Sequence, residues 1–221
     1  MLYICFMRLL IVSATEAEIR PYLKEIAESG NGTDVLITGV GVPATTYRLT
    51  RALMQGRYDL AINAGIAGSF DRKLPLGTVV QVVSDGFADL GAEDGADFLD
   101  LFRLGLAEPD TPPFTGGRLE NRFRAEGLQE AQGITVNTVH GREESIRACQ
   151  ARFPAVTESM EGAAFFYVCL NENIPCLQIR ALSNYVERRS RANWNIPLAV
   201  SALNHSLIDL VRGYTNENLI R

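Results

Sequence analysis

The chain alternates short apolar runs with longer stretches in which apolar residues recur every three or four positions. A short apolar run bounded by turn residues predicts a buried strand, and the longer spacing predicts a helix packed along one side. The expected strands are Leu9–Ser13, Val35–Thr38, Leu60–Asn63, Thr78–Ser84, Ile134–Val139 and Cys176–Leu182. The expected helices are Glu16–Ser29, Val42–Gln55, Ser159–Asn171 and Ala199–Gly213.

Strands separated by helices predict an α/β fold with a central mixed, twisted β-sheet flanked by helices. We expect a single domain over residues 1–221, because the length suits one domain and no Pro/Ser-rich or charged linker interrupts the chain. Ala88–Gly117 is rich in Gly, Pro and Asp, and is expected to be a long functional loop. A further hypothesis places the true start at Met7, with residues 1–6 a mis-called extension.

Composition excludes several classes of function. The 21 basic and 26 acidic residues give a net charge of -5, which argues against nucleic-acid binding. Four cysteines without a C-x-x-C pair, and only two histidines, predict reduced thiols, no metal site and no cofactor. The apolar N-terminus is too short to span a membrane and lacks the basic lead of a signal peptide. We therefore expect a cytoplasmic protein that binds neither membrane nor nucleic acid.

The segment Gly39–Ala44 follows an expected strand, opens an expected helix and matches the dinucleotide pattern G-x-G-x-x-A. A dinucleotide site also needs an acid at the end of the next strand, to hold ribose. Asp59 has about the right spacing but precedes that strand, and the motif does not follow the first strand of the chain. A tight strand-to-helix turn is the favoured interpretation.

Two early segments carry candidate chemistry at strand ends, where the ligands of α/β sheets gather. Glu16 and Glu18 begin the first helix, where acids often only complement the helix dipole, but Glu18 is also placed to activate a water. Small residues in Gly65–Gly68 let the backbone approach a ligand, so that its N–H groups can bind a hydroxyl or an oxyanion. A plain tight turn explains the same small residues.

Two later segments are open to two interpretations each. Glu158 and Glu161 lie at the start of the strongest expected helix, either as solvated capping acids or as carboxylates that accept hydrogen bonds from a sugar diol. Ser183 and Asn184 end an apolar strand, where they either begin a turn or offer the Asn184 amide to a purine edge.

In this order, the motifs resemble the nucleoside phosphorylase/nucleosidase superfamily over nearly the whole chain, and its methylthioadenosine/S-adenosylhomocysteine nucleosidase branch in particular. The matches are A-x-x-x-E at residues 14–18, G-x-A-G at residues 65–68, E-x-M-E at residues 158–161 and R-A-x-S at residues 180–183. Each motif is weak alone, but their collinear occurrence is specific. The resemblance implies a nucleoside phosphorylase-like fold and a small nucleoside substrate.

Position 184 departs from that branch. Adenine-releasing relatives place Asp there to protonate N7 of the leaving base, whereas Asn184 can only donate a hydrogen bond. A 6-oxopurine needs less help to leave, because negative charge delocalises onto its oxygen. Residues 183–188 with Arg191 and Trp194, and the Asp85–Asp94 region, are similar to futalosine hydrolases. That resemblance implies hydrolysis of futalosine to hypoxanthine and dehypoxanthine futalosine, in an alternative menaquinone pathway.

The resemblance also implies a role for each motif residue. Glu18 would activate a water against C1′, and Asn184 would stabilise the departing base. Glu161 would hold the ribose hydroxyls with Met160 packed on the sugar, and such hydrogen bonds strengthen as an oxocarbenium-like transition state forms. The other expected substrate contacts are the backbone near Ala67 and Gly68, the base-flanking Val139 and His140, and Arg180. For His140, a surface turn is an equally good interpretation.

The 5′ side of the substrate is less clear from the sequence. Futalosine bears a benzoate there, with which Arg188, Arg189 or Arg191 would pair, but a solvated basic turn explains the same residues. Trp194 is more typical of a core than of a ligand stack. Since related nucleosidases are commonly dimers, we expect a homodimer.

Three rival functions are weighed against this one. A phosphorylase would need a cationic phosphate pocket, and related phosphorylases place an Arg just before the glycine-rich turn, where this chain has Asn63 and Ala64. A nucleosidase acting on methylthioadenosine, S-adenosylhomocysteine or aminodeoxyfutalosine would release adenine, and position 184 discriminates against it. A non-catalytic nucleoside-binding protein is disfavoured because both Glu18 and Glu161 are retained.

Overall fold

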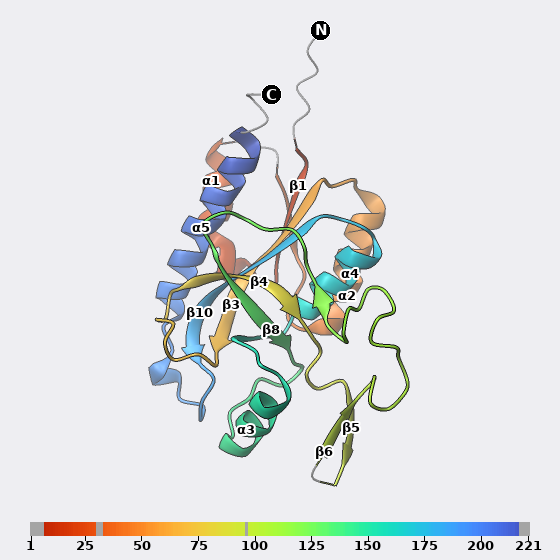
Figure 1. Ribbon diagram of the computed structural model, residues 1–221. Helices are drawn as coiled ribbons and strands as arrows, with labels where there is room; N and C mark the ends of the chain where they lie inside the picture. Colours follow the sequence, from red (N-terminus) through yellow and green to blue (C-terminus); the bar gives the residue numbers. More distant parts are fainter. Residues whose placement is uncertain (1–6, 30–32, 96, 217–221) are drawn as a thin grey trace.

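The computed structural model describes residues 7–29, 33–95 and 97–216 (Figure 1). Its strands are β1 (Leu9–Ser13), β2 (Asp34–Ile37), β3 (Leu60–Ser69), β4 (Val79–Asp85), β5 (Gly91–Asp94), β6 (Asp97–Asp100), β7 (Leu119–Glu120), β8 (Gln129–Thr135), β9 (Thr157–Ser159) and β10 (Cys176–Tyr185). Its helices are α1 (Glu16–Ser29), α2 (Val42–Gln55), α3 (Glu143–Arg152), α4 (Gly162–Asn171) and α5 (Ile196–Asn216), with a 3-10 turn at Arg191–Asn193. The expected α/β architecture is confirmed, while the hypothesis about residues 1–6 lies outside the described residues.

The strands form a mixed sheet that closes partly on itself. β10 pairs with β3 in parallel and with β4 antiparallel, β4 pairs with β8, β8 with β9, and β9 with β3. These five strands therefore make a ring, and β1 and β2 extend from β3 by parallel pairing. The parallel strands β1, β3 and β10 end at the same edge, which brings the segments that follow them together.

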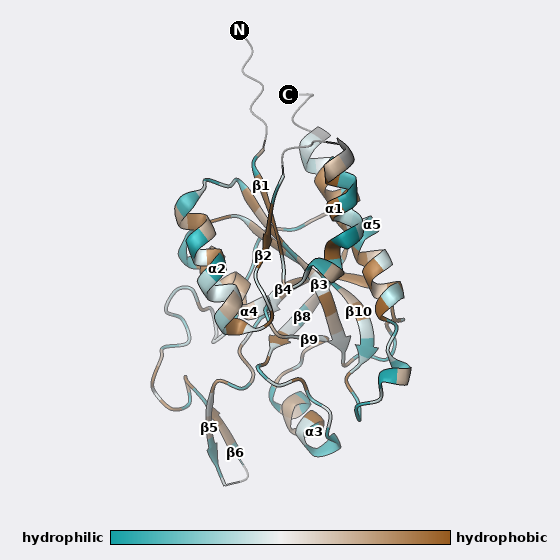
Figure 2. Cartoon of the chain, turned by 180° about the vertical axis from the view of Figure 1, so that it is seen from behind, coloured by the Kyte–Doolittle hydropathy of each residue, from teal (hydrophilic) through white to brown (hydrophobic). Residues whose placement is uncertain are grey.

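Both faces of the sheet are covered by helices (Figure 2). Successive side chains of a strand point to opposite faces. In β1, Leu9 and Ile11 pack in the cluster that α1 and α5 share, while Leu10 and Val12 pack in the cluster of α2 and α4. Each of these four side chains is at most 2% exposed, so each contributes about 1.5–3 kcal/mol of burial free energy. Burial on both faces explains why β1 reads as a continuous apolar run.

Helix α1 is kinked just after its first turn, and a side chain of α5 repairs the break. Ile19 has φ -118° and ψ 17°, and Pro21 follows within the helix. In a regular helix the Tyr22 N–H would donate to the Glu18 carbonyl. Here Asn204 is inserted between them: its Oδ1 accepts from the Tyr22 N–H at 2.9 Å and its Nδ2 donates to the Glu18 carbonyl at 2.8 Å. α5 thereby fixes the backbone of Glu18.

The largest differences from the sequence-based expectation lie at strand ends. The glycine-rich segment expected as a turn after Asn63 continues β3 to Ser69, because it pairs with β10 on one side and β9 on the other. The strand expected at Ile134–Val139 is β8, which begins at Gln129 and ends at Thr135, because its polar first half pairs with β4 through the backbone. The helix expected from Ser159 begins at Gly162, since Thr157–Ser159 form β9.

Two elements had no clear sequence signal. Helix α3 is mostly polar and buries only Ile146 and Cys149. The hairpin of β5 and β6 lies within Ala88–Gly117, which was expected to be a loop, and exposed polar residues dominate β5. Within the described ranges, no helix combines the length and apolar character needed to cross a bilayer.

Candidate active site

Glu18 lies at the start of α1, directly beyond the end of β1. Its Oε2 accepts hydrogen bonds from the Thr15 backbone N–H at 3.1 Å and from the Thr15 hydroxyl at 2.8 Å, as in a helix capping box. Its Oε1 accepts from the Ile66 N–H of β3 at 3.1 Å. One oxygen therefore binds the start of the helix, and the other faces the glycine-rich strand. A role in the helix start alone accounts for only one of the two oxygens.

Arg180 of β10 lies opposite Gly65 in the parallel pairing with β3. It is 1% exposed and donates to the Asn63 side-chain oxygen and, at 3.2 Å, to the Ile179 carbonyl. Its Nε has no hydrogen-bond partner among the described residues. A Cβ at Gly65 would lie 3.1 Å from both Arg180 Nη1 and Glu18 Oε1. The glycine thus leaves the space in which the guanidinium and the carboxylate face each other.

Glu161 precedes α4 and turns toward the same cluster. It is 9% exposed, and its Oε1 accepts from the Gly41 N–H at 2.9 Å. Burial raises the pKa of Glu161, and the Glu18 charge acts in the same direction. The Arg180 cation and the Gly41 hydrogen bond oppose this shift. The carboxylates of Glu18 and Glu161, expected to converge, do lie near one guanidinium.

The segment Gly39–Ala44 forms the tight turn favoured by the sequence and has a second use. Gly39 and Gly41 have φ of 80° and 93°, which favour glycine. The N–H of Gly41 is the donor to Glu161, a contact that the sequence did not indicate.

Asn184 lies near the end of β10, paired with Gly68 of β3. Its Oδ1 accepts from the Ser183 hydroxyl at 2.8 Å, and its Nδ2 donates to the Tyr185 carbonyl at 3.1 Å. The Ser183 hydroxyl also reaches the Ala67 carbonyl at 3.2 Å. Asn184 is partly buried and borders Gly68, so it does not point into the core.

Three predicted substrate contacts lie on the segments before and after β9. Val139 is 39% exposed, and Met160 is partly buried between β9 and Glu161. His140 is not a solvated turn residue: its N–H donates to Glu158 Oε1 at 3.0 Å and its Nδ1 contacts Glu158 Oε2. Hydrogen bonds with the Cys149 sulfur and with the Glu158 carboxylate raise the pKa of His140 to about 10, against the opposing effect of burial.

The basic residues after β10 have two different environments. The Arg189 guanidinium lies 5.7 Å from the centre of the Trp194 ring, which makes a cation–π contact. Arg188 lines a hollow that also contains Arg72, Arg142 and Arg147. Glu187 and Glu143 lie in the same hollow and pair with Arg72 and Arg147. Arg188 and Arg142 are therefore the cations there that best suit a carboxylate ligand.

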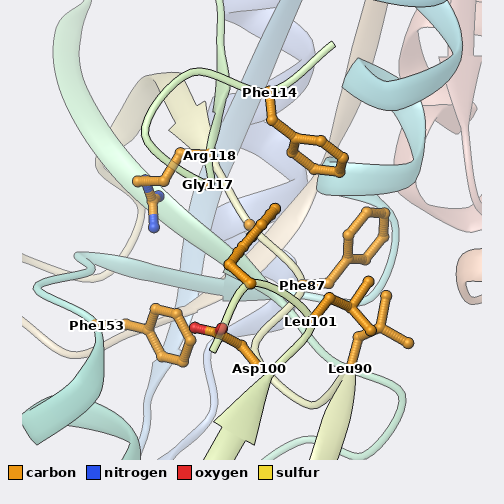
Figure 3. A pocket seen from close by; sticks show the side chains of 10 residues that line it. Phe87, Leu90, Asp100, Leu101, Phe114, Gly117, Arg118 and Phe153 are labelled. Carbon is orange, nitrogen blue, oxygen red and sulfur yellow. The ribbon is translucent and has the colours of Figure 1, made fainter. Parts of the chain in front are cut away.

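A small aromatic cavity lies between the β5–β6 segment and the sheet, lined by Phe87, Phe114 and Phe153 with Arg118 beside them (Figure 3). Arg118 donates from Nε to the Ser84 hydroxyl at 2.6 Å and from Nη2 to the Gly133 carbonyl at 2.7 Å. The cavity volume of about 40 Å³ has room for a water but not for a nucleoside. Its lining side chains pack residues Ala88–Gly117, called the excursion below, against the sheet.

The fold and the strand-end cluster define a protein of the nucleoside phosphorylase and nucleosidase class. The family described as the phosphorylase superfamily matches residues 12–211, and the chain belongs to it. It is 34% identical over 180 residues to the futalosine hydrolase of Streptomyces coelicolor, covering 78% of this chain and 76% of that one. It is 26% identical over 200 residues to the 5′-methylthioadenosine/S-adenosylhomocysteine nucleosidase of Colwellia psychrerythraea, covering 81% and 79%.

Solved structures show the same fold. A crystal structure of the Colwellia psychrerythraea nucleosidase, in complex with adenine, superimposes with a TM-score of 0.78 at 21% identity and covers 97% of this chain and 98% of that chain. The expected nucleoside phosphorylase-like fold is thereby confirmed.

Proposed function

We propose that this protein hydrolyses the N-ribosidic bond of futalosine and releases hypoxanthine and dehypoxanthine futalosine. The observation that carries the proposal is the cluster of Glu18, Arg180 and Glu161, with Asn184 further along the strand that carries Arg180. The chain also has about one-third identity to a futalosine hydrolase. An amide at position 184 suits a 6-oxopurine leaving group better than an adenine, which needs a proton donor.

In the proposed mechanism, Glu18 acts as general base. Its Oε1, directed to the glycine-rich strand, takes a proton from a water that attacks C1′. As the water oxygen bonds to C1′, the bond from C1′ to the purine nitrogen breaks and its electron pair leaves with the base. Asn184 donates a hydrogen bond to N7 or to the 6-oxo group and stabilises that charge.

Glu161 holds the ribose hydroxyls in the same proposal, with Met160 packed on the sugar. A carboxylate that is mostly buried accepts hydroxyl hydrogen bonds in place of water, and those bonds strengthen as positive charge develops at the neighbouring carbon. Backbone N–H groups near Ala67 and Gly68 orient the sugar or the water. Val139 and His140 flank the base.

Water is favoured over phosphate as the nucleophile, for a reason that differs from the sequence argument. The sequence has no Arg at Asn63 or Ala64, but the structure supplies a cation there, because Arg180 donates a hydrogen bond to the Asn63 side chain. Two carboxylates, Glu18 and Glu161, face that single guanidinium. An anionic nucleophile would meet an excess of negative charge there, whereas water would not.

The proposal extends to the whole protein. We place residues 1–221 in one nucleosidase domain, in a cytoplasmic enzyme that uses no metal or other cofactor, and we propose that it is a homodimer. Exposed apolar side chains support a dimer: Tyr47 and Met54 on α2, Leu90 and Leu106 on the excursion, and Tyr167 on α4. α2, α4 and the excursion lie on the same side of the sheet (Figure 1). Arg188, with its neighbouring cations, is the proposed partner of the benzoate.

The decisive experiment is incubation of the protein with futalosine, inosine and methylthioadenosine, each with and without phosphate, with chromatographic identification of the purine released. The proposal expects hypoxanthine from futalosine at a rate that is independent of phosphate. Adenine release from methylthioadenosine as the fastest reaction would identify an adenine-type nucleosidase instead. A strict requirement for phosphate would identify a phosphorylase.

A further inference from the structure

Helix α4 begins directly after Glu161, but the Glu161 side chain does not cap it. The residue before a helix usually accepts a hydrogen bond from the N–H of the second or third helical residue, and Ser, Thr, Asp and Asn do this best. Glu161 makes no such bond, and its Oε1 accepts from the Gly41 N–H instead. The Gly162 N–H donates to Ser159 Oγ at 3.3 Å. The next N–H of the helix, that of Ala163, therefore needs an acceptor from another element.

Thr135, the last residue of β8, supplies that acceptor. Its side chain is fully buried, and its Oγ1 accepts from the Ala163 N–H at 2.7 Å. Its backbone is held on both sides by the segment after β4: the Thr135 N–H donates to the Gly86 carbonyl at 2.8 Å, and its carbonyl accepts from the Ala88 N–H at 2.9 Å. The cap of α4 thus comes from the sheet and not from the residue that precedes the helix.

Asp85, at the end of β4, orients the capping hydroxyl. A hydroxyl has one hydrogen, and Thr135 donates it to Asp85 Oδ1 at 3.1 Å, which leaves the lone pairs of Oγ1 for the Ala163 N–H. Asp85 Oδ2 accepts from Gln178 Nε2 of β10 at 2.9 Å. A Cβ at Gly162 would lie 2.3 Å from Asp85 Oδ2, so glycine lets the start of α4 lie directly against this carboxyl group.

We propose that Thr135, held by Asp85, is a positioning residue that caps α4 in place of Glu161 and thereby leaves the Glu161 carboxylate free to hold the sugar. The inference rests on the proposed function, in which Glu161 binds the ribose hydroxyls. Thr135 acts only through Glu161 and the start of α4.

Loss of the Thr135 hydroxyl has a specific consequence for Glu161. The Ala163 N–H would be left without an acceptor in buried surroundings, which is costly. Glu161 lies two residues earlier, and acids at the start of a helix are attracted to its free N–H groups. Its carboxylate would therefore turn back to the helix, and the sugar would lose its acceptor.

The test is a double-mutant cycle between Thr135→Val and Glu161→Gln, with kcat and KM measured on whichever of futalosine, inosine and methylthioadenosine the wild type cleaves fastest. We expect Thr135→Val to lower kcat about 10- to 100-fold, the effect of a misplaced group, with a smaller change in KM, because bonds to the sugar strengthen in the transition state. In the Glu161→Gln background the same change should lower kcat less than about 3-fold, since the contact that Thr135 protects is already lost.

Two further variants separate positioning from general stability. Thr135→Ser keeps the hydroxyl and should recover most of the kcat that Thr135→Val loses. Thr157→Val, at an equally buried threonine of β9, is the matched control and should keep wild-type kcat. If Thr135→Val does not fold, Thr135→Ala replaces it in the cycle, because alanine removes the hydroxyl without placing a methyl group against the Ala163 N–H.

Equal losses of kcat in the two backgrounds overturn the inference, and so does wild-type kcat in a folded variant without the hydroxyl. A loss in Thr135→Ser as large as that in Thr135→Val also overturns it. Coupling between Thr135 and Glu161 in a protein that cleaves methylthioadenosine but not futalosine contradicts the proposed function alone. A wild type that cleaves none of the three nucleosides contradicts both.

Discussion

Arg180 shows how single residues set the character of this site. Burial lowers the pKa of its guanidinium, and the charges of Glu161, Glu18 and Asp85 oppose that shift. Nearby acidic groups therefore favour the charged guanidinium, and an unpaired buried charge would be costly. Glu18 has one oxygen bound to the Ile66 N–H and is the residue that we propose acts on a water.

Glu18→Gln should lower kcat by about 10²- to 10⁴-fold, the usual contribution of a general base, because an amide cannot take a proton. The fold should be spared, since glutamine can still accept from Thr15. Steady-state assays of base release and a thermal melt check both statements. Glu16→Gln, two residues earlier in α1 and exposed, is the control and should keep wild-type turnover. A Glu18→Gln variant with substantial kcat would remove Glu18 from its proposed role.

Asp85 predicts a pH-dependent stability. It is fully buried, and burial raises its pKa although Gln178, Gly86 and the Arg118 charge favour the ionised form. A carboxyl whose folded pKa is raised contributes most stability below its usual pKa near 3.8 and loses it as the pH rises through the folded pKa. Asp85→Asn resembles the protonated acid. Its amide nitrogen can donate to the Gln178 oxygen, which has no partner among the described residues, once the Gln178 amide rotates.

We therefore expect Asp85→Asn to gain free energy of unfolding relative to the wild type as the pH rises from 4 to 8, by at most about 1.4 kcal/mol per pH unit. Urea melts across this pH range measure the difference. The exposed Asp89→Asn serves as the control and should leave the profile unchanged. A constant difference between Asp85→Asn and the wild type would show that Asp85 is ionised in the fold throughout.

At the scale of elements, α5 supports the proposed site through the backbone of α1. Asn204 occupies the break in α1 and binds both the Tyr22 N–H and the Glu18 carbonyl. The kink that Pro21 helps to form directs the first turn of α1, and with it the Glu18 side chain, toward β3. Two elements far apart in the chain thus position the proposed base.

Asn204→Leu should cost about 1–3 kcal/mol for each of the two backbone groups that it leaves without a partner. It should also lower kcat more than it raises KM, because Glu18 loses its backbone anchor. Chemical denaturation and steady-state kinetics test the two effects separately. Asn171→Leu, at the exposed end of α4, is the matched control. Unchanged kcat in the Asn204 variant would mean that α5 supports α1 without positioning Glu18.

Helices α1 and α5 cover one face of the sheet and α2 and α4 the other, and several exposed apolar side chains gather on the side of α2, α4 and the excursion. Tyr167 of α4 contacts Phe87 and Phe114 at ring-centre distances of 6.4 Å and 6.0 Å, so the excursion and α4 form one surface. A monomer with this many exposed apolar groups on one side would bury them by pairing.

Sedimentation equilibrium should therefore give twice the 24.3 kDa mass of the chain. Tyr47→Glu, at a position 62% exposed, places a charge on the proposed interface and should shift the mass toward one chain. Ile196→Glu changes an exposed apolar residue at the start of α5, away from this surface, and should not. A wild-type mass of one chain at micromolar concentration contradicts the proposed dimer.

Much of the fold could be predicted from local pattern. The bounds of β1, α1 and α2 agree with the apolar spacing, because each of these elements buries a continuous run or a helical stripe. β9 and β8 could not be placed correctly, since polar residues in them are held by backbone pairing with strands distant in sequence. α3 was missed because it buries only two side chains.

The sequence by itself determined which groups this protein has for chemistry: the acids Glu18 and Glu161, the cation Arg180, and an amide rather than an acid at position 184. Only the tertiary structure decided how they act, because their neighbours come from other parts of the chain. Gly41 reaches Glu161, Asn204 holds Glu18, and His140 holds Glu158. Such contacts depend on strand pairing and helix packing over long sequence separations, and no local pattern encodes them.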